Sequence, residues 1–348
     1  MHIALYEDSR CQAWDDFVYR QPQGTMFHTI AWKRVVERTF GHPAFYFYAQ
    51  EGDAIRGVLP LFWVKSPLSG NALVSVPFSI YGGILADSEE SAAALLQAAK
   101  ELAQEKGVAH VEFRHQHSNA LDLPVKDLYV TFVLPLPSDP EVVWKEMRKR
   151  NRNILRKGEK SGLGLYRQPQ PGVLEPHEVD TFYHLFARSQ QALGTPVLPR
   201  ALFTHLQEEF GQGNTIYSVT CEGKIITSLW VFSWRDFISP YYIGYDPAYL
   251  QYAPNNWVLW QVIKDACAAG YRYYDMGRSR KDTGSYHFKI HWGIEPQPLH
   301  YQYYLHRATS IPQVNPSNPK YDLPRRIWSR LPLGLTKAIG PHLVKYLG

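Results

Sequence analysis

Hydrophobic and polar positions along this 348-residue chain follow the same order of patterns twice. An alternating aromatic run, a Glu-Gly turn and a second apolar run fill residues 40–64, and the same order returns in residues 210–234 at an offset of 170–171. Alternation with a period of two predicts paired β-strands joined by a tight turn. Because both the order and the spacing recur, the chain is predicted to contain two copies of one structural unit.

Each copy continues with a predicted helix, a glycine that ends the helix and a short strand. In the second copy the helix covers residues 257–269 and Gly270 follows it, whereas Gly107 ends the matching helix of the first copy. The strand after each glycine carries an acidic residue, Glu112 in the first copy and Asp275 in the second, at an offset of 163. Strands and helices in this order predict an α+β fold for both copies.

The segment between the two copies combines helix signals with a strong positive charge. Asp139 and Pro140 suit the start of a helix and Gly162 suits its end, so one helix is predicted over residues 139–162. Residues 145–160 contain eight basic and two acidic residues, a net charge of +6, whereas the whole chain carries +5. The rest of the chain is therefore almost neutral, and the positive charge is concentrated on this segment.

Four of these basic residues recur at every fourth position and form one stripe on the predicted helix: Arg148, Arg152, Arg156 and Lys160. Like charges at this spacing destabilise an isolated helix by about a few tenths of a kcal/mol per pair. The stripe is either a solvated helix face or a binding site for an anion, and the repulsion among its members favours the anion.

These patterns divide the chain into three predicted parts. Residues 1–138 form the first unit, residues 139–306 form the basic helix with the second unit, and residues 307–348 form a proline-rich loop with a basic aromatic tail. No acidic residue follows Asp322, while Arg and Lys are interleaved with Trp, Ile and Leu, a composition that suits an anionic membrane surface. Residues 325–348 are expected either to contact a membrane peripherally or to pack on this protein or on a partner.

The composition excludes several other classes of protein. Hydrophobic residues make up 45% of the chain and charged residues 20%, as in folded globular proteins. Acidic residues interrupt the N-terminal segment where a secretory signal would be apolar, and the longest apolar run, residues 58–64, is far shorter than the ~20 residues that span a bilayer. We expect a cytoplasmic protein that meets the membrane only peripherally, at its inner face.

Neither the cysteines nor the histidines predict a metal site. Cys11, Cys221 and Cys267 lie far apart and form no CxxC pair, which also argues against a disulfide framework. His110, Glu112, His115 and His117 lie in one stretch, but strand alternation over residues 110–114 directs them along a surface face. The chain is therefore predicted to hold no metal ion.

Residues 274–299 hold the densest set of chemical groups. They combine a strand end bearing Asp275, a glycine turn, four cations and several hydroxyl groups beside aromatic rings. Arginine can bind phosphate or carboxylate with two hydrogen bonds, and glycine lets the backbone approach a ligand closely. The run HFKIHWG is predicted to be an extended strand, which places His287, Lys289 and His291 on one face. Lys289 then either binds an anion or an oxyanion, or is an edge-strand lysine in water.

Three segments together resemble the FemAB-like transferases, in particular the branch associated with exopolysaccharide and PEP-CTERM protein-sorting loci. They are RKRNRNILRKGEKSGL at 148–163, FARSQQALGTPVLPRALFTHL at 186–206, and the Asp-x-Gly-Arg-Ser motif that begins at Asp275. The resemblance spans roughly residues 25–306. It implies two tandem GNAT-type acyltransferase folds, each with a mixed, mostly antiparallel sheet flanked by helices.

The resemblance also implies a reaction and its residues. Related enzymes transfer an aminoacyl group from aminoacyl-tRNA to the amine of a peptidoglycan precursor, or an acyl group from coenzyme A. Lys289 would stand at the reacting centre and stabilise the oxyanion, while Asp275 or His287 would take the proton of the attacking amine. The expected substrate-binding residues are Arg278, Ser279, Lys281, Arg148, Arg152, Arg156, Tyr241, Tyr242 and Trp292, although the two tyrosines could instead pack between sheet and helix.

The sequence therefore predicts an N-acyltransferase or aminoacyltransferase that acts on an amino group of a cell-envelope or exopolysaccharide precursor. Its partners would be a donor, acyl-CoA or aminoacyl-tRNA, and a sugar or peptide acceptor linked to lipid or nucleotide, with no permanently bound cofactor. The donor stays open, because the pyrophosphate-loop motif of coenzyme-A-binding acetyltransferases is missing from both copies. The alternative is a non-catalytic module whose basic groove binds RNA or anionic polysaccharide.

Overall fold

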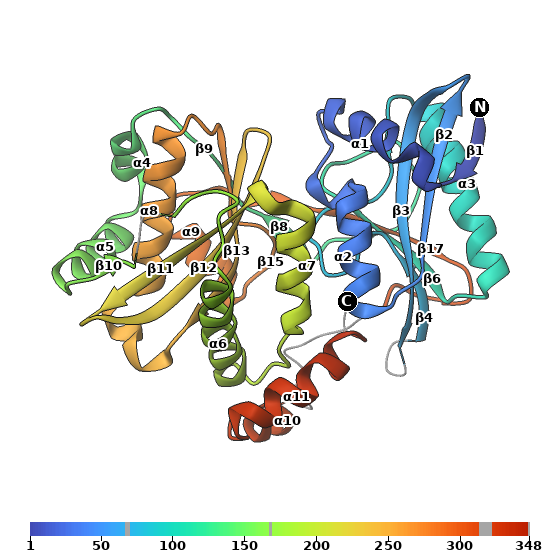
Figure 1. The fold of residues 1–348 in the computed structure, drawn as a ribbon. Coiled ribbons are helices and arrows are strands. Elements are labelled where there is room, and N and C mark those ends of the chain that lie inside the picture. Colours follow the sequence, from blue (N-terminus) through green and yellow to red (C-terminus); the bar gives the residue numbers. More distant parts are fainter. Residues whose placement is uncertain (67–69, 167–168, 313–321, 347–348) are drawn as a thin grey trace. The chain divides into compact units, whose positions relative to one another are not determined.

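The computed structural model describes residues 1–66, 70–166, 169–312 and 322–346, and it divides them into two compact units (Figure 1). Of the described residues, unit 1 takes 1–129, 298–312 and 345–346, and unit 2 takes 130–297 and 322–344. Each unit contains a mixed sheet with helices packed against it, so the predicted α+β class is confirmed.

Unit 1 is built on a mostly antiparallel sheet in which only β4 and β6 run parallel. Its strands in spatial order are β1 (His2–Leu5), β2 (Ala44–Glu51), β3 (Ala54–Ser66), β4 (Gly70–Val74), β6 (His110–His115), β17 (His300–Leu305) and β7 (Val125–Lys126), and β5 (Leu85–Ala86) pairs with β3. The main helices of this unit are α1 (Cys11–Arg20), α2 (Ile30–Phe40) and α3 (Glu89–Lys106), with short 3-10 turns at Asp8–Arg10 and Met26–His28.

Unit 2 repeats this arrangement, with β13 and β14 as its parallel pair. Its strands in spatial order are β10 (Gly164–Leu165), β11 (Asn214–Cys221), β12 (Lys224–Trp234), β13 (Phe237–Tyr245), β14 (Tyr273–Asp275) and β9 (Val133–Pro135). Its helices include α4 (Pro140–Glu146), α5 (Lys149–Lys160), α6 (Pro176–Ala192), α7 (Arg200–Phe210), α8 (Pro254–Ala268) and α9 (Gly284–Ile290), with 3-10 turns at Gly211–Gly213 and Pro247–Tyr252. Three short strands, β15 (Ser279–Arg280), β8 (Tyr129–Thr131) and β16 (Gln297–Pro298), form a small additional sheet.

The strand register confirms the internal repeat and fixes its offset. The hairpins β2–β3 and β11–β12 each contain a register shift, after Ala49 in unit 1 and after Val219 in unit 2, a constant offset of 170. The same offset aligns Gly52 with Glu222, and both residues have positive φ, 58° and 51°, as a two-residue hairpin turn requires. Glu51-Gly52 and Glu222-Gly223 are therefore 171 positions apart, one more than the offset of 170 that relates the two hairpins.

Helices cover both faces of the unit 2 sheet (Figure 1), and alternating side chains of β12 pack in a core on each face. Leu229 and Val231 pack in the core that contains the apolar residues of α8. Trp230 points to the other face, where its ring lies 5.5 Å from both Phe182 of α6 and Phe203 of α7. Because helices cover both faces of the sheet, β12 is mostly apolar along its length and does not alternate between apolar and polar residues.

The unit boundaries differ from the predicted ones because one strand of each sheet comes from a distant part of the chain. β9 follows the first repeat in sequence but pairs with β14 in unit 2, with Leu134 opposite Tyr274. β17 follows the second repeat but pairs with β6 in unit 1, with Tyr303 opposite Glu112. Hydrophobic pattern identifies such strands but carries no information on which sheet they join.

The predicted single helix over residues 139–162 is wrong, because the chain forms two helices there. α4 ends at Glu146, and Met147 and Arg148 adopt extended ψ angles of 141° and 140° before α5 begins. The Met147 side chain at this break is buried in the unit 2 core, and the Arg152 guanidinium donates to the Met147 carbonyl oxygen at 2.8 Å.

The C-terminal segment forms two further helices, α10 (Asp322–Trp328) and α11 (Leu333–Val344), which belong to unit 2. α11 packs against α6, and the ammonium of Lys337 lies 5.1 Å from the ring centroid of Tyr183. The segment therefore packs on its own protein, which is one of the two arrangements expected from the sequence. Most of the predicted proline-rich loop lies outside the described residues. No helix of the described residues has the length and apolar character that crossing a membrane requires.

Candidate functional site

The turn after β14 brings together the residues that the sequence places at the reacting centre. Asp275 is 5% exposed, and its Oδ1 accepts hydrogen bonds from the backbone N–H of Gly277 at 2.7 Å and from the Thr131 hydroxyl at 3.5 Å. Gly277 has a φ of 70°, a conformation that favours glycine and lets the chain turn directly after the strand. The carboxylate is thus held at the strand end by its own turn.

Lys289 lies under this turn and is 8% exposed. Its Nζ donates to the carbonyl oxygens of Gly277 at 2.8 Å and Arg278 at 3.0 Å, and it lies 5.5 Å from the ring centroid of Phe132. Burial lowers the pKa of Lys289 to about 8, with Asp275 opposing this shift and Arg278 adding to it. Asp275 and Lys289 therefore share one buried site, although they are fourteen positions apart.

The predicted strand at HFKIHWG is wrong, because these residues form the helix α9 and its C-terminal end. The hydroxyl of Thr283 accepts a hydrogen bond from the backbone N–H of Tyr286 at 3.4 Å, which caps the start of the helix. In a helix, His287 and His291 share one face while Lys289 points to another. The structure consequently separates His287, which is exposed, from the buried Lys289.

His287 and His291 instead join the basic residues that precede and open α5. Burial lowers the pKa of His291, and the positive charges of Arg150, Arg148 and the nearby His287 lower it further. Arg148 and Arg150 are exposed at the N-terminal end of α5, the positive end of the helix dipole. The exposed Arg148, Arg150 and His287 therefore lie near enough to the half-buried His291 to act on it electrostatically.

Two other members of the predicted basic stripe have structural contacts. Nη1 of Arg152 donates to the carbonyl oxygens of Lys145 at 2.8 Å, Met147 at 2.8 Å and Trp144 at 3.2 Å, and so satisfies the C-terminal end of α4. The guanidinium of Arg156 lies 5.5 Å from the ring centroid of Trp144. Arg152 is therefore a helix-capping residue in this structure.

The remaining predicted residues divide between the turn and the cores. Ser279 is buried, and its hydroxyl lies 2.9 Å from that of Ser285, while Arg278 and Lys281 are half-buried in the same turn region. Tyr242 packs in the aromatic core with its ring 5.3 Å from Phe203, and Tyr241 lies against it at 4.7 Å. Trp292 is 2% exposed in the other core of unit 2.

Sequence reasoning missed the contribution of residues 131–132. Thr131 contacts Asp275 and Phe132 contacts Lys289, although they precede those residues by more than 140 positions. They reach the site because β9, which directly follows them, pairs with β14, and the backbone N–H of Met276 donates to the carbonyl oxygen of Phe132 at 2.9 Å. No local pattern signals this proximity, which only the strand pairing of unit 2 creates.

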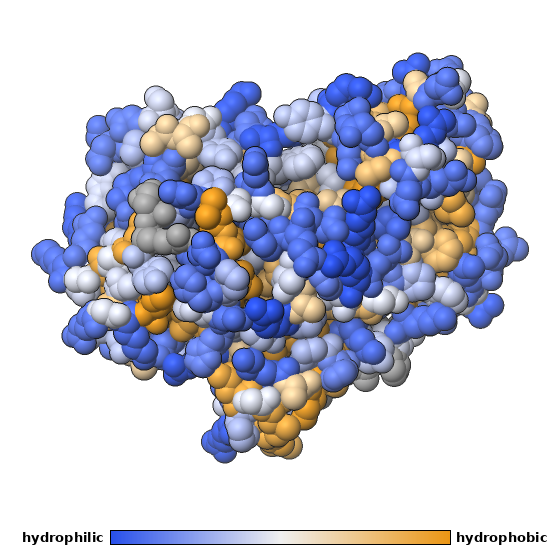
Figure 2. Space-filling model, viewed as in Figure 1, coloured by the Kyte–Doolittle hydropathy of each residue, from blue (hydrophilic) through white to orange (hydrophobic). Residues whose placement is uncertain are grey.

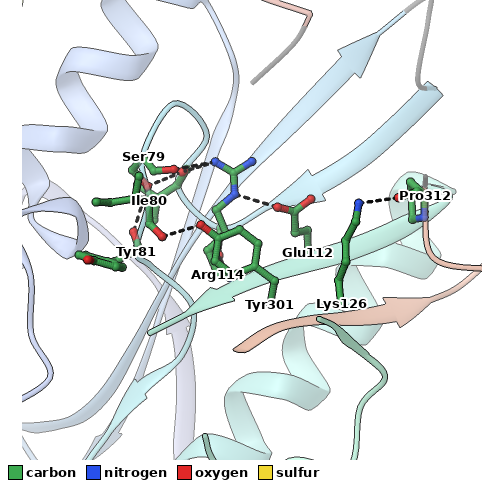
Figure 3. Close-up of polar contacts among 10 residues, drawn as sticks. Ser79, Ile80, Tyr81, Glu112, Arg114, Lys126, Tyr301 and Pro312 are labelled. Carbon is green, nitrogen blue, oxygen red and sulfur yellow. Dashed lines mark hydrogen bonds and ion pairs between the residues drawn. The ribbon is translucent and has the colours of Figure 1, made fainter. Parts of the chain in front are cut away.

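The corresponding acidic residue of unit 1 lies within β6 and has different chemistry (Figure 3). Glu112, the counterpart of Asp275 by the offset of 163, forms an ion pair with Arg114, whose Nε lies 2.8 Å from Oε1. Burial disfavours the charged carboxylate, but the Arg114 guanidinium and hydrogen bonds hold the pKa of Glu112 below its usual range. The acidic group of unit 1 is thus neutralised internally.

Arg114 also organises the loop that covers this strand. Its Nη1 donates to the carbonyl oxygens of Ser79 at 3.0 Å and Val76 at 3.4 Å, and the Tyr301 hydroxyl donates to Ile80 at 2.6 Å (Figure 3). Val76 and Phe78 have φ angles of 57° and 63°, which are unfavourable for side chains of these types. The hydrogen bonds of Arg114 and Tyr301 hold this strained loop in place.

Two mixed sheets of the same strand order, each with a parallel pair and flanking helices, define a tandem GNAT-like fold. Residues 145–289, which contain the turn after β14, match the family model of the acetyltransferase (GNAT) domain. No curated protein matches the chain. The comparisons thus assign the domain type to unit 2 and the fold to the whole chain.

Solved structures resemble almost the whole chain. FemX is 15% identical, covers 93% of this chain and 100% of its own, and has a TM-score of 0.67. The C-terminal domain of a putative lysylphosphatidylglycerol synthetase from Agrobacterium fabrum is 13% identical, covers 84% and 91%, and has a TM-score of 0.59. A tandem GNAT protein from the clavulanic acid biosynthesis pathway is 12% identical, covers 87% and 98%, and has a TM-score of 0.55. At these identities the similarity establishes the fold.

Proposed function

We propose that this protein is an N-acyltransferase or aminoacyltransferase of the FemAB-like type, which forms an amide on an amino group of a cell-envelope or exopolysaccharide precursor. The observation that carries the proposal is the buried ammonium of Lys289 beside Asp275, at the strand-end turn of the unit that matches the acetyltransferase (GNAT) domain. A cation and a carboxylate held together at low exposure are the groups that acyl transfer to an amine requires.

In the proposed reaction the acceptor amine attacks the carbonyl carbon of the donor. A C–N bond forms, the C–O bond of an aminoacyl-tRNA ester or the C–S bond of an acyl-CoA thioester breaks, and the leaving group takes up a proton. Lys289 directs two of its three N–H groups to the carbonyls of Gly277 and Arg278. Among the described residues, the third N–H has no acceptor, and we assign it to the oxyanion of the tetrahedral intermediate.

Asp275 is the group best placed to take the proton of the amine. One of its oxygens accepts from Gly277 and Thr131, and the carboxylate lies in the same buried site as Lys289, on whose pKa it acts. His287 is the other proton acceptor that the sequence offers, but α9 directs it away from Lys289. We therefore assign His287 to the binding of an anion, together with Arg148, Arg150 and His291.

These four basic residues supply the binding energy for a phosphate-bearing substrate. Arg148 and Arg150 can each form two hydrogen bonds with a phosphate, and the imidazole rings of His287 and His291 can donate further hydrogen bonds to it. Both candidate donors, acyl-CoA and aminoacyl-tRNA, carry phosphates, as do acceptors linked to lipid diphosphates or nucleotides. The resemblance to the exopolysaccharide and PEP-CTERM branch supports an acceptor of this kind.

The test is native mass spectrometry with thermal-shift screening of the purified protein against acetyl-CoA, longer acyl-CoA species and aminoacyl-tRNA. We expect one donor class to bind, and Arg148→Gln with Arg150→Gln to weaken that binding by about tenfold or more, as the loss of two bidentate phosphate contacts predicts. Arg20→Gln, at an exposed arginine of unit 1, is the matched control and is expected to bind as the wild type does.

One result would favour the non-catalytic module instead. Charged and uncharged tRNA would bind equally, affinity would fall steeply with salt, and no amide product would form with any amine acceptor. Binding of an acyl-CoA or of aminoacyl-tRNA alone, followed by transfer, supports the enzyme and identifies its donor.

A further inference from the structure

The helices α10 and α11 expose large apolar side chains on one surface of unit 2. Leu323 and Ile327 of α10 and Leu335, Ile339 and Leu343 of α11 are between 39% and 67% exposed. Figure 2 shows hydrophobic side chains gathered over the two helices, at the lower end of the view. Folded proteins seldom gather exposed apolar side chains on one short segment unless that surface binds something.

α11 has one face for packing and another that carries these apolar residues. Thr336 and Gly340 are buried, and a Cβ atom added at Gly340 would lie 2.8 Å from the backbone nitrogen of Val197. Leu335, Ile339 and Leu343 follow at intervals of four and therefore share the outer face. The small residues bring the helix close to unit 2, and the large ones point away from it.

The charge of the segment identifies the partner. Residues 323–348 contain five basic and no acidic residues. Arg326 of α10 and Arg330, which follows it, are exposed, whereas Lys337 of α11 is half-buried with its ammonium near the Tyr183 ring of α6. Asp322, at the start of α10, pairs with Arg325 at 3.9 Å and is the one acidic residue of the two helices. An apolar surface bordered by an excess of cations is complementary to a layer of apolar chains beneath anionic headgroups.

We infer that α10 and α11 form a docking surface for a lipid bilayer that contains anionic phospholipids. The two helices have seven and twelve residues, and a helix of twelve residues is only about 18 Å long, shorter than the ~30 Å of a bilayer core. They would therefore lie in the interface, with the outer apolar face among the acyl chains and the arginines at the phosphates. This inference does not depend on the proposed transferase activity.

The surface is already folded before it meets a membrane. Both helices are part of unit 2, and the side-chain amide of Gln191 in α6 donates to the carbonyl oxygen of Leu331 between them. Docking should therefore occur without additional helix formation, unlike the binding of a disordered basic tail.

The experiment is co-sedimentation of the full-length protein with vesicles of phosphatidylcholine alone and of phosphatidylcholine with about one-third phosphatidylglycerol. We expect the protein to bind the anionic vesicles, binding to weaken with salt, and circular dichroism to show no gain of helix. Leu335→Gln, Ile339→Gln and Leu343→Gln combined should reduce the partition coefficient by about tenfold or more.

A matched control removes three exposed apolar residues elsewhere: Leu5→Gln, Val125→Gln and Leu250→Gln. It should sediment as the wild type does, while Arg326→Gln with Arg330→Gln should weaken binding to anionic vesicles and should not affect folding, because both side chains are exposed. Equal sedimentation of the wild type and both test variants would overturn the inference. So would a wild-type dimer that the apolar variant dissociates while no vesicle is bound, because the surface would then serve self-association.

Discussion

Lys289 shows how a single residue can serve both the fold and the proposed chemistry. Its ammonium fixes the turn after β14 through two backbone carbonyls, and the same burial brings its pKa to about 8. A lysine with a pKa near the working pH changes its charge over a range in which most lysines stay protonated. This makes its role accessible to a pH profile.

We predict that kcat/KM for amide formation falls as the pH rises through about 8, because the ammonium that binds the oxyanion then loses its proton. Lys289→Arg keeps a permanent charge, so its residual activity should lack this descending limb. Lys65→Met, at an exposed lysine of unit 1, should keep the wild-type profile. A descending limb that persists unchanged in Lys289→Arg would assign it to another group.

The contribution of Lys289 to the stability of the fold has the opposite dependence on pH. The pKa of Lys289 is about 8 in the folded protein and 10.5 in a fully solvated lysine. Between these values the unfolded chain binds a proton that the folded chain does not, so this residue makes the fold more stable as the pH rises. Activity and the contribution of Lys289 to stability should therefore change in opposite directions above about pH 8.

At the scale of elements, α4 and α5 depend on one arginine side chain. Arg152→Met removes three hydrogen bonds from the C-terminal carbonyls of α4, and we expect it to lower the free energy of unfolding by about 1–3 kcal/mol. Lys157→Met, on an exposed position of the same helix, should change it by no more than about 0.5 kcal/mol. Urea denaturation measures both, and equal effects would remove the capping role of Arg152.

The packing of α11 on unit 2 predicts opposite effects for two glycines of the same helix. Gly340→Leu forces a side chain against the Val197 backbone, and we expect a loss of about 1–3 kcal/mol in the free energy of unfolding. Gly334→Ala meets no atom within 4 Å and should stabilise the helix by about 0.5–1 kcal/mol. Thermal unfolding distinguishes the two, and an unaffected Gly340→Leu variant would mean that α11 does not pack closely.

The elements that the sequence predicted well are those with strong local signals. The hairpins at 40–64 and 210–234 follow from alternation and turn residues, and α8 follows from a helical period that Gly270 ends. The run HFKIHWG failed because its alternation was outweighed by the Thr283 cap. The break between α4 and α5 carries no proline or glycine, and buried Met147 and capping Arg152 create it through tertiary contacts.

The candidate site likewise contains residues that local sequence patterns predict and residues that only long-range strand pairing brings in. Asp275 and Lys289 could be found from the sequence because they lie in one segment with a motif. Thr131 and Phe132 could not, because only the long-range pairing of β9 with β14 brings them there. The placement of His287 required the correct element type, since residues two apart share one face of a strand but point to different faces of a helix.

At the scale of the whole molecule, two units with the same fold carry their equivalent acidic residues in different surroundings. In unit 1, Glu112 is paired with Arg114, which also holds the loop over its strand. In unit 2, Asp275 lies with a buried lysine beneath a tight turn. We conclude that duplication preserved the architecture, and we expect transfer chemistry only in unit 2.

The most direct test compares the two equivalent acids, using the donor that the binding screen identifies and an amine acceptor. Asp275→Asn keeps an oxygen for the Gly277 N–H but removes the base, so kcat for amide formation should fall by about a hundredfold or more. Glu112→Gln should lower stability while leaving kcat within about threefold of the wild type, because its partners are structural. A wild-type rate in Asp275→Asn, or an equal loss of kcat in a folded Glu112→Gln, would contradict the assignment of the chemistry to unit 2.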